Sequence, residues 1–306
     1  MTFIRIRALL SAVGLTLGTL SVRAAFEDPL WSARSAALGG AFTTVGDDPT
    51  AAFYNPAAAA SVRPRGANFG YAQLFTGVDE VDLSMNQLAY VHPLPAKTIM
   101  ALGWGSVVAG SLRREDTVVL SAAQRYDDVP GVGSFSAGLS LRYLSQKYTL
   151  DSRSASDPVF KDGAGQDAVA IDLHAHLPNM DFLLPGLSAG LSLRSLNQPN
   201  VGLGETQRLP FEAALGARYD WKNWSTPLDF VFREGTLTPQ LGVEGRFVEN
   251  RLAARLGTDT HQVGAGLGYR HAMGKTTHLS VDYTFMWPLE VESTSGSHRA
   301  TIGLEF

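Results

Sequence analysis

The sequence lacks cysteine and is poor in charged residues. No Cys occurs among its 306 residues, which excludes a disulfide framework and lipid attachment at a cysteine. Asp, Glu, Lys and Arg together make up 18% of the chain, whereas about 25% is typical of globular proteins. The net charge is only −4 and no basic stripe is present, so the sequence gives no case for a nucleic-acid partner.

Long apolar runs are also missing, except at the start of the chain. Arg5 and Arg7 precede an apolar stretch at residues 8–20, and residues 22–24 offer small side chains at the positions that a signal peptidase reads. We therefore predict a cleavable export signal over residues 1–24. No later segment has the roughly 20 apolar residues that a membrane-spanning helix needs. Such a chain can span a membrane only as a closed β-barrel, since every backbone polar group must be paired within lipid.

From about residue 67 onward, apolar and polar side chains alternate along the chain. In residues 134–143 every odd position is apolar or aromatic, and every even position is Ser, Gly or Arg. Successive side chains of a strand point to opposite faces, so this pattern predicts strands with one apolar face. We expect about fourteen transmembrane strands, each about 9 to 11 residues long, between turns. The pattern is weakest at residues 81–92, 97–107 and 225–233.

A pair of soluble β-sandwiches would also show alternating strands. Two features instead favour an all-β fold of another type, an antiparallel transmembrane β-barrel over residues 67–306. Strands follow one another with little helix or linker between them. In addition, many apolar runs end in aromatic residues, which is typical of the girdles at membrane interfaces. These aromatic residues include Tyr143, Tyr219, Trp221, Tyr269 and Trp287.

The last ten residues form a strand with one apolar face. Its apolar side consists of Ala300, Ile302, Leu304 and Phe306, and the chain ends on that aromatic residue. This ending resembles the terminal assembly signal of bacterial outer-membrane β-barrels. The resemblance implies that Ile302, Leu304 and Phe306 are recognised by the barrel-assembly machinery, that lipid surrounds the barrel, and that the protein lies in the bacterial outer membrane.

Residues 25–66 differ from the rest of the chain because their period-two pattern is poor. Residues 31–57 within it are rich in Ala and Gly and are broken by two prolines, Pro49 and Pro56. Gly39-Gly40 and Asn55-Pro56 mark tight turns. We therefore expect short helical turns and extended pieces that fold compactly.

Motifs at both ends of the chain resemble one known family. They are Ala33-Arg34 through Leu38-Gly39-Gly40-Ala41-Phe42, Gly46-Asp47-Asp48, Asn55-Pro56-Ala57 and, near the other end, Gly266-Leu267-Gly268-Tyr269-Arg270, Leu279-Ser280-Val281-Asp282-Tyr283 and His298-Arg299. This combination resembles the PorV/PorQ-type branch of the FadL-like outer-membrane proteins. The resemblance implies that residues 25–66 form an N-terminal hatch inside the barrel. The hatch residues would be Arg34, Gly39, Gly40, Asp47, Asp48, Asn55 and Pro56.

No motif supports an enzyme. Ser188 stands in a G-x-S-x-G pattern, but that motif requires a sharp strand-to-helix turn and Ser188 lies within a predicted strand. His174 and His176 share a strand face, yet a zinc site needs a third or fourth ligand and the sequence marks none. We therefore expect no catalytic residue, no metal and no cofactor.

Polar residues of the predicted inward face are rich in arginine. Buried charges need partners, so the interpretation that we favour is a set of ion pairs that fills the lumen and holds the hatch. The alternative is a selectivity lining for an anionic head group. The predicted luminal lining consists of Arg142, Asp172, His174, Arg194, Glu212, Arg218, Arg270, Asp282 and Arg299.

The resemblance leaves two functions open. FadL-like proteins imply the binding or passive translocation of a hydrophobic small molecule through a plugged lumen. The PorV/PorQ branch implies an accessory barrel of protein secretion or surface attachment, related to the type IX pathway, whose partners are secreted proteins. We expect short connections throughout the barrel, which argues against cargo loops. The sequence therefore favours transport of a hydrophobic ligand, with secretion as the alternative.

Overall fold

The structure is a computed structural model that describes residues 26, 29–63, 65–78, 82–152, 154, 156–291 and 294–306. The predicted export signal, residues 1–24, lies outside the described residues. Among the described residues, no helix is long and apolar enough to cross a membrane.

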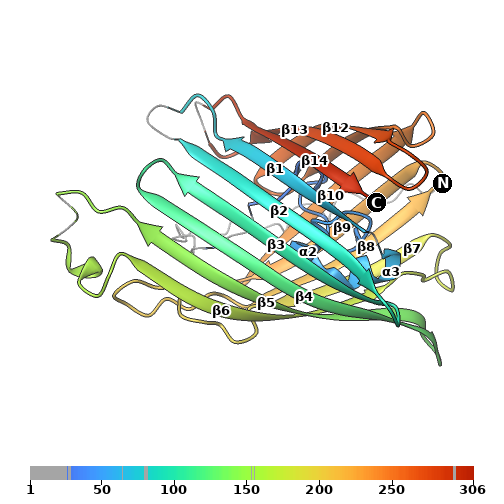
Figure 1. The fold of residues 1–306 in the computed structure, drawn as a ribbon, viewed down its shortest axis with the longest axis horizontal. Helices are drawn as coiled ribbons and strands as arrows, with labels where there is room; N and C mark the ends of the chain where they lie inside the picture. Colours follow the sequence, from blue (N-terminus) through green and yellow to red (C-terminus); the bar gives the residue numbers. More distant parts are fainter. Residues whose placement is uncertain are drawn as a thin grey trace, which may run out of the picture.

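Fourteen antiparallel strands in the described ranges close into one barrel (Figure 1), which confirms the predicted fold. Each strand pairs with its neighbours in the sequence, and β1 pairs with β14. The weakly patterned segments are strands as expected. The strands are β1 (Gly66–Leu74), β2 (Leu83–Leu94), β3 (Thr98–Ala109), β4 (Arg113–Val129), β5 (Gly133–Tyr148), β6 (Gly165–Leu177), β7 (Leu187–Arg194), β8 (Glu212–Trp221), β9 (Trp224–Arg233), β10 (Thr236–Phe247), β11 (Leu252–Thr258), β12 (Gln262–Ala272), β13 (His278–Pro288) and β14 (Ser297–Glu305).

The barrel closes between its first and last strands. β1 and β14 run antiparallel, with Gly66 opposite Glu305 and Gln73 opposite His298. The final strand thus completes a ring in which no strand edge is left unpaired, as lipid requires.

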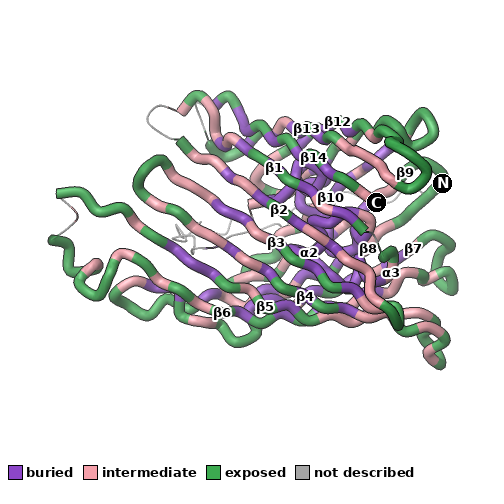
Figure 2. Tube along the Cα trace, in the orientation of Figure 1, coloured by how far each residue is buried: buried purple, intermediate pink, exposed green. Residues whose placement is uncertain are grey.

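Buried and exposed residues alternate along the strands as the polar and apolar residues of the sequence do (Figure 2). In β12, Gly264, Gly266 and Gly268 are buried, whereas Leu267 and Tyr269 are exposed. Apolar side chains therefore cover the outside of the barrel, and small or polar ones face its interior. This arrangement is the reverse of a soluble sandwich, in which the shared apolar face is buried.

The structure corrects two expectations about the barrel. β4 has 17 residues and β5 has 16, longer than the predicted 9 to 11, because both continue beyond the other strands as a paired hairpin. Connections are also not all short, since residues 149–164 join β5 to β6 and residues 195–211 join β7 to β8.

The two rims of the barrel differ. We call the rim at Gly66 and Glu305 the terminal rim and the other the opposite rim. Both long connections lie at the opposite rim, whereas residues 95–97 and 222–223 make tight turns at the terminal rim. Outer-membrane barrels have short turns at one rim and longer loops at the other, and this barrel shows the same asymmetry.

Residues 29–63, here called the luminal segment, lie inside the barrel. Three short helices form in it: α1 (Ala33–Ala37), α2 (Ala51–Tyr54) and α3 (Pro56–Val62). Ser32 and Ser35 cap α1 reciprocally, and Gly39 and Gly40 end it with positive φ angles of 64° and 86°. Asn55 caps α3, whose first residue is Pro56.

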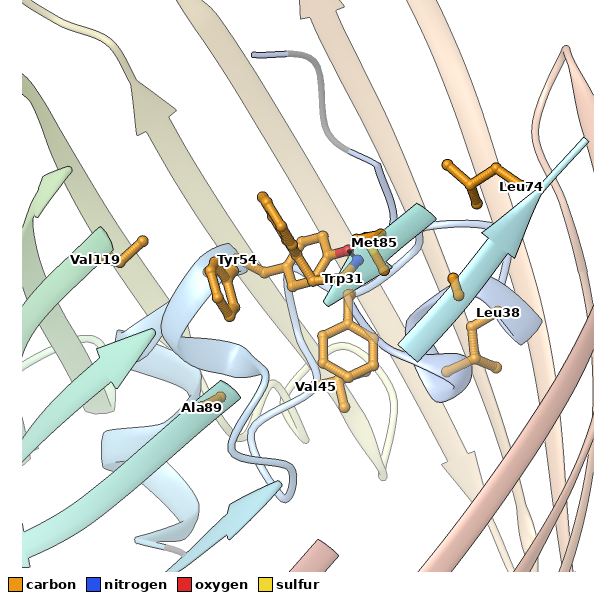
Figure 3. Close-up of a cluster of buried hydrophobic side chains, with 11 residues drawn as sticks. Trp31, Leu38, Val45, Tyr54, Leu74, Met85, Ala89 and Val119 are labelled. Carbon is orange, nitrogen blue, oxygen red and sulfur yellow. Dashed lines mark hydrogen bonds between the residues drawn. The ribbon is translucent and has the colours of Figure 1, made fainter. Parts of the chain in front are cut away.

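Almost every side chain of the luminal segment is buried. Figure 3 shows residues of this segment, including Trp31, Leu38 and Tyr54, packed against Met85 and Val119 of the barrel wall. The core of the protein thus lies between the luminal segment and the inner face of the strands.

Glycines in the wall permit this close packing. A Cβ atom on Gly257 would lie 2.3 Å from the backbone carbon of Leu38, and one on Gly105 would lie 1.9 Å from the ring of Trp31. Both separations are far below van der Waals contact. The high glycine content of the strands therefore has a steric cause, since the luminal segment leaves no room for side chains there.

Candidate functional site

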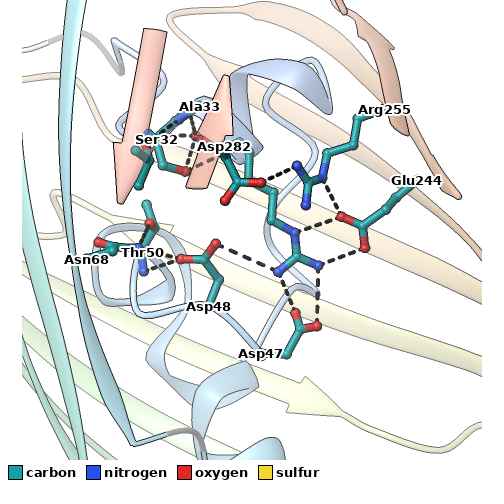
Figure 4. A network of polar contacts seen from close by, with 12 residues as sticks. Ser32, Ala33, Asp47, Asp48, Thr50, Asn68, Glu244, Arg255 and Asp282 are labelled. Atoms are coloured by element: carbon teal, nitrogen blue, oxygen red, sulfur yellow. Dashed lines mark hydrogen bonds and ion pairs between the residues drawn. The ribbon is translucent and has the colours of Figure 1, made fainter. Parts of the chain in front are cut away.

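A buried arginine of α1 joins the luminal segment to the barrel wall. Arg34 Nη1 lies 2.9 Å from Asp47 Oδ1, within the same segment, and Arg34 Nε lies 2.9 Å from Glu244 Oε2 of β10. Asp48 Oδ2 lies 3.7 Å from Nη1. Figure 4 shows Asp47, Asp48 and Glu244 turned toward this guanidinium. Two parallel bonds to a carboxylate fix the orientation of an arginine as well as its position.

Further charges of the wall extend these contacts. Glu244 also pairs with Arg246 at 2.8 Å and with Arg255 at 2.5 Å, and Arg255 pairs with Asp282 at 2.5 Å. We call this set the charged cluster. It consists of Arg34, Asp47, Asp48, Glu244, Arg246, Arg255 and Asp282. Cations and anions alternate through it, so each buried charge has a partner of opposite sign.

The two aspartates of the luminal segment have opposite pKa shifts. Burial opposes ionisation of Asp47, but the guanidinium groups of Arg34 and Arg246 hold its pKa well below the ordinary value. Burial raises the pKa of Asp48, because Arg34 and the hydrogen bonds from Thr50 only partly offset the loss of hydration. Asp47 is therefore the carboxylate that ties its loop electrostatically to the wall.

Backbone groups of the luminal segment are held by side chains of the wall. Asp229 Oδ2 accepts hydrogen bonds from the N–H groups of Phe42 at 2.9 Å and Thr43 at 2.8 Å. Arg299 Nη1 donates to the carbonyl of Leu30 at 2.6 Å. Asn55 Nδ2 donates to the carbonyl of Ala175 at 3.0 Å. A segment without regular pairing partners is thus satisfied by the strands that enclose it.

The two predicted lumen histidines are buried on the inner face of β6. His174 contacts Ser140 and Ser192 with both ring nitrogens at 3.0 Å, and His176 Nδ1 lies 2.8 Å from Ser61 Oγ of α3. In the described ranges, no group of three or more His, Asp or Glu side chains is arranged to hold a metal ion. These contacts suit a structural role in seating the luminal segment.

An aromatic pocket lies on the side of the luminal segment that faces the opposite rim. The rings of Trp31 and Phe53 stack with their centroids 4.7 Å apart, and Leu209 of the 195–211 connection lines the same pocket. The empty space is about 40 Å³. The pocket is lined by Phe26, Trp31, Phe53, Val107, Leu209 and Pro210, with Glu115, Thr117, Arg142, Arg194, Ser195, Glu212 and Arg233 around them.

The connection at residues 195–211 folds inward over this pocket. Val201 and Leu209 are buried with Phe26 and Leu144, and the N–H of Leu209 donates to the carbonyl of Pro199 at 2.8 Å. The connection therefore covers part of the lumen at the opposite rim.

Polar spaces lie on the other side of the luminal segment, toward the terminal rim. Two neighbouring cavities of about 330 and 270 Å³ share Arg34, Asp47, Arg246 and Asn250 in their walls. We call them together the polar chamber. The lumen is thus divided into a small aromatic pocket and a larger charged space, with the luminal segment between them.

The structure places all predicted site residues on the inside of the protein, apart from the three of the terminal strand. The seven predicted hatch residues belong to the luminal segment, and the nine lining residues lie on inward-facing positions of the strands. Arg142 pairs with Asp172 at 2.6 Å, and Arg194 pairs with Glu212 at 2.8 Å. Arg270 pairs with Glu305, and Arg218 donates to the carbonyl of Thr44 at 3.0 Å. Asp282 belongs to the charged cluster. The functional roles of these residues stay predictions.

Some functional contacts could not be assigned from the sequence pattern. Asp229 binds two backbone N–H groups, yet it lies in a strand whose alternation is weak. Its signal was a single acidic residue among apolar neighbours in residues 227–232. Leu209 was missed because it belongs to a connection, which the alternation of strands does not describe.

The three residues of the predicted assembly signal face outward. Ile302, Leu304 and Phe306 are all exposed on the barrel surface. Their position is compatible with contact to lipid, and their recognition during assembly stays a prediction.

These features define the class of the protein, a plugged β-barrel with the fold of FadL-type channels. A scan against protein-family models found no match, and no curated protein matches the sequence. Solved structures do match. The CymD monoaromatic hydrocarbon channel has a TM-score of 0.58 at 12% identity, covering 92% of this chain and 97% of that chain.

Two further solved structures share the fold. The toluene transporter TbuX of Ralstonia pickettii has a TM-score of 0.58 at 14% identity, over 91% of this chain and 99% of that chain. A FadL homologue of Pseudomonas aeruginosa has a TM-score of 0.54 at 14% identity, over 88% and 95%. These structural similarities establish a common fold. At identities this low they do not assign the chain to the PorV/PorQ branch.

Proposed function

We propose that this protein is an outer-membrane barrel that binds a hydrophobic small molecule and lets it pass through its lumen without an energy source. The observation that carries the proposal is the aromatic pocket, in which stacked Trp31 and Phe53 lie under an apolar cover at the opposite rim. Solved barrels of the same fold include channels for monoaromatic hydrocarbons and toluene. Stacked rings in a small pocket suit an aromatic or aliphatic ligand.

The outer-membrane location is part of this proposal. The barrel exposes apolar side chains on its outside, and aromatic residues such as Tyr269, Trp221 and Trp224 lie near the terminal rim. Such a surface suits a lipid bilayer with aromatic girdles.

Passage requires movement of two elements. The pocket holds about 40 Å³, room for only a few water molecules, since each needs roughly 10–15 Å³ of such space. The 195–211 connection must therefore shift to admit a ligand, and part of the luminal segment must shift to release it into the polar chamber. We infer that the luminal segment acts as a hatch, as its sequence resemblance implied.

The pocket also has a polar edge. Glu212 is shared by two guanidinium groups, Arg194 at 2.8 Å and Arg233 at 3.7 Å. This edge suits a ligand with a polar or acidic end beside its apolar body.

Binding of toluene to the purified barrel tests the proposal. Toluene should quench or shift tryptophan fluorescence and should protect the barrel against heat. Trp31→Ala should weaken this binding at least tenfold by removing one face of the stack, since burial of an aromatic side chain contributes about 1.5–3 kcal/mol. Trp287→Ala, on the exposed outside of β13, is the matched control. Equal binding by both variants would refute the pocket assignment.

A secretion accessory is the second candidate. The motifs shared with the PorV/PorQ branch form much of the charged cluster, and the connections at residues 149–164 and 195–211 are long enough to offer a surface at the opposite rim. This role predicts co-purification with exported proteins that share one carboxy-terminal domain. Toluene binding without any such partner would favour transport.

A further inference from the structure

One connection at the terminal rim exposes an apolar surface. Residues 178–186 join β6 to β7, and we call them the apolar turn. Phe182 is 76% exposed, Leu183 is 64% exposed and Leu184 is 43% exposed. Three adjacent large apolar side chains on a turn need a partner other than water.

The apolar turn is an ordered structure. The N–H of Met180 donates to the carbonyl of Leu187 at 2.8 Å, and the N–H of Leu183 donates to the carbonyl of Met180 at 2.8 Å. The carboxylate of Asp181 accepts from the N–H of Gly186 at 3.0 Å. Gly186 in turn accepts from the N–H of Asp220 on β8 at 2.9 Å. These hydrogen bonds fix the backbone of the apolar turn in a conformation that leaves its three apolar side chains exposed.

Other connections at the same rim have a different composition. Residues 222–223 are Lys and Asn, residues 248–251 contain a single apolar residue with Glu, Asn and Arg, and residues 273–277 contain a single large apolar residue with Lys and two Thr. In the apolar turn the one charged residue, Asp181, is engaged with the backbone. The apolar turn therefore suits a different environment from that of its neighbours.

Position along the rim indicates what that environment is. On one side lie Tyr219 and Trp221 of β8, and on the other lie Tyr126 and Phe135 of β4 and β5, stacked with centroids 5.1 Å apart. Neither β6 nor β7 contains Phe, Tyr or Trp. Phe182 therefore supplies the aromatic residue that the girdle lacks between these strands. The apolar turn lies at the same end of the barrel as the carboxy terminus (Figure 1).

We propose that the apolar turn inserts into the lipid bilayer at the terminal rim, with Phe182, Leu183 and Leu184 at the boundary between head groups and acyl chains. Its occupant is lipid because the turn continues the apolar outer surface of the barrel. Amphipathic segments bury their apolar side chains at this depth. The inference goes beyond the proposed transport and uses only the membrane location.

Single-cysteine labelling tests the proposal, because the chain has no native cysteine. The variants Leu183→Cys and Phe182→Cys are labelled with an environment-sensitive fluorophore and placed in phosphatidylethanolamine and phosphatidylglycerol vesicles. Their emission should shift to the blue, and lipids that carry a quencher near the head group should remove most of it. Aqueous iodide should have little effect.

Two controls frame the result. A label at Thr276→Cys, in the polar turn at the same rim, should respond to iodide and not to quenching lipid. A label at Leu267→Cys, on the outside of β12, should respond to quenching lipid. If the Leu183 label behaves like the Thr276 label, the lipid contact is wrong. If it is open to iodide in vesicles but protected in cell membranes, a protein covers the turn and the proposal is overturned. Exposure of the Leu267 label to iodide would overturn the membrane location itself.

Discussion

Replacing Arg34 by Met tests whether the charged cluster holds the luminal segment in place. The substitution removes the cation that pairs with Asp47 and Glu244 at 2.9 Å each and keeps most of the side-chain volume. Glu244 is 1% exposed, so its charge stays buried in the folded state. We expect the luminal segment to open more often while the barrel stays folded.

The expected change in the free energy of opening depends on the partners that Glu244 keeps. Breaking a buried ion pair costs about 3–5 kcal/mol, because it leaves an uncompensated charge. Glu244 keeps Arg246 and Arg255 as partners, so the lower end, about 3 kcal/mol, applies. A difference of about 1.4 kcal/mol corresponds to a factor of ten, so opening should become roughly 100-fold more frequent.

A thiol-reactivity assay measures this opening. Ala60→Cys places a reporter on α3 at a fully buried position, and the chain offers no competing cysteine. A water-soluble maleimide reacts with this thiol only when the segment opens, so the labelling rate reports the opening equilibrium. Arg34→Met should raise the rate roughly 100-fold, and Arg34→Lys should raise it less because a charge remains.

The control removes an ion pair on the exposed surface. Arg114 Nε lies 2.7 Å from Asp116 at the barrel surface, and exposed pairs contribute at most about 1 kcal/mol. Arg114→Met should therefore leave labelling of the Ala60→Cys thiol nearly unchanged. A rate increase below about fivefold for Arg34→Met would refute the role of the charged cluster.

Three more predictions concern the luminal segment and assembly. The pKa of Asp47 is lower in the folded state, so its ion pairs stabilise the segment at neutral pH and this stability is lost as pH falls below about 4 toward the folded pKa; Asp47→Asn should raise thiol labelling at pH 7 and weaken its dependence on acid. Gly257→Val should displace α1, because its Cβ would lie 2.3 Å from Leu38, and labelling should rise by at least about tenfold. Phe306→Ser should lower the amount of heat-modifiable, folded barrel in membranes without changing ligand affinity.

Each of these predictions has an outcome that contradicts it. An unchanged acid dependence in Asp47→Asn would assign the acid response to other groups. A Cβ atom on Gly274 would have no neighbouring atom within 4 Å, so Gly274→Val is the matched control for Gly257→Val, and equal effects would disprove the steric argument. Normal amounts of folded Phe306→Ser protein would count against the assembly signal.

Much of the barrel could be predicted because its physical rule is local. An apolar outside and a packed lumen inside force side chains to alternate with period two, so residues such as those at 134–143 reveal their own orientation. The pairing of β1 with β14 could be predicted, because a closed barrel must join its first strand to its last. The lengths of β4 and β5 were not predicted. The two strands stay paired beyond the rest of the barrel, and the sequence does not mark where this pairing stops.

The luminal contacts depend on chain segments far apart in sequence. Arg34 could be selected by resemblance, but its pairing with Glu244 depends on how α1 sits in the barrel. Asp229 and Leu209 lie in segments without a clear pattern, and their contacts arise only when the luminal segment and the 195–211 connection fold inward. The wall glycines have the same origin, since the close approach of Leu38 to Gly257 and of Trp31 to Gly105 exists only in the folded barrel.

The attachment of the luminal segment to the last strands has a consequence for biogenesis. The N–H of Ala33 donates to Thr301 of β14 at 2.9 Å, its carbonyl accepts from Thr284 of β13 at 2.6 Å, and Arg299 binds the carbonyl of Leu30. A segment near the start of the chain thus forms bonds with strands that are made last. The ring closes where β14 pairs with β1, so the strand that bonds the segment is also the strand that seals the barrel. Packing of the interior is therefore coupled to formation of the last two strands, and residues 29–63 reach their final contacts only after the end of the chain has been made.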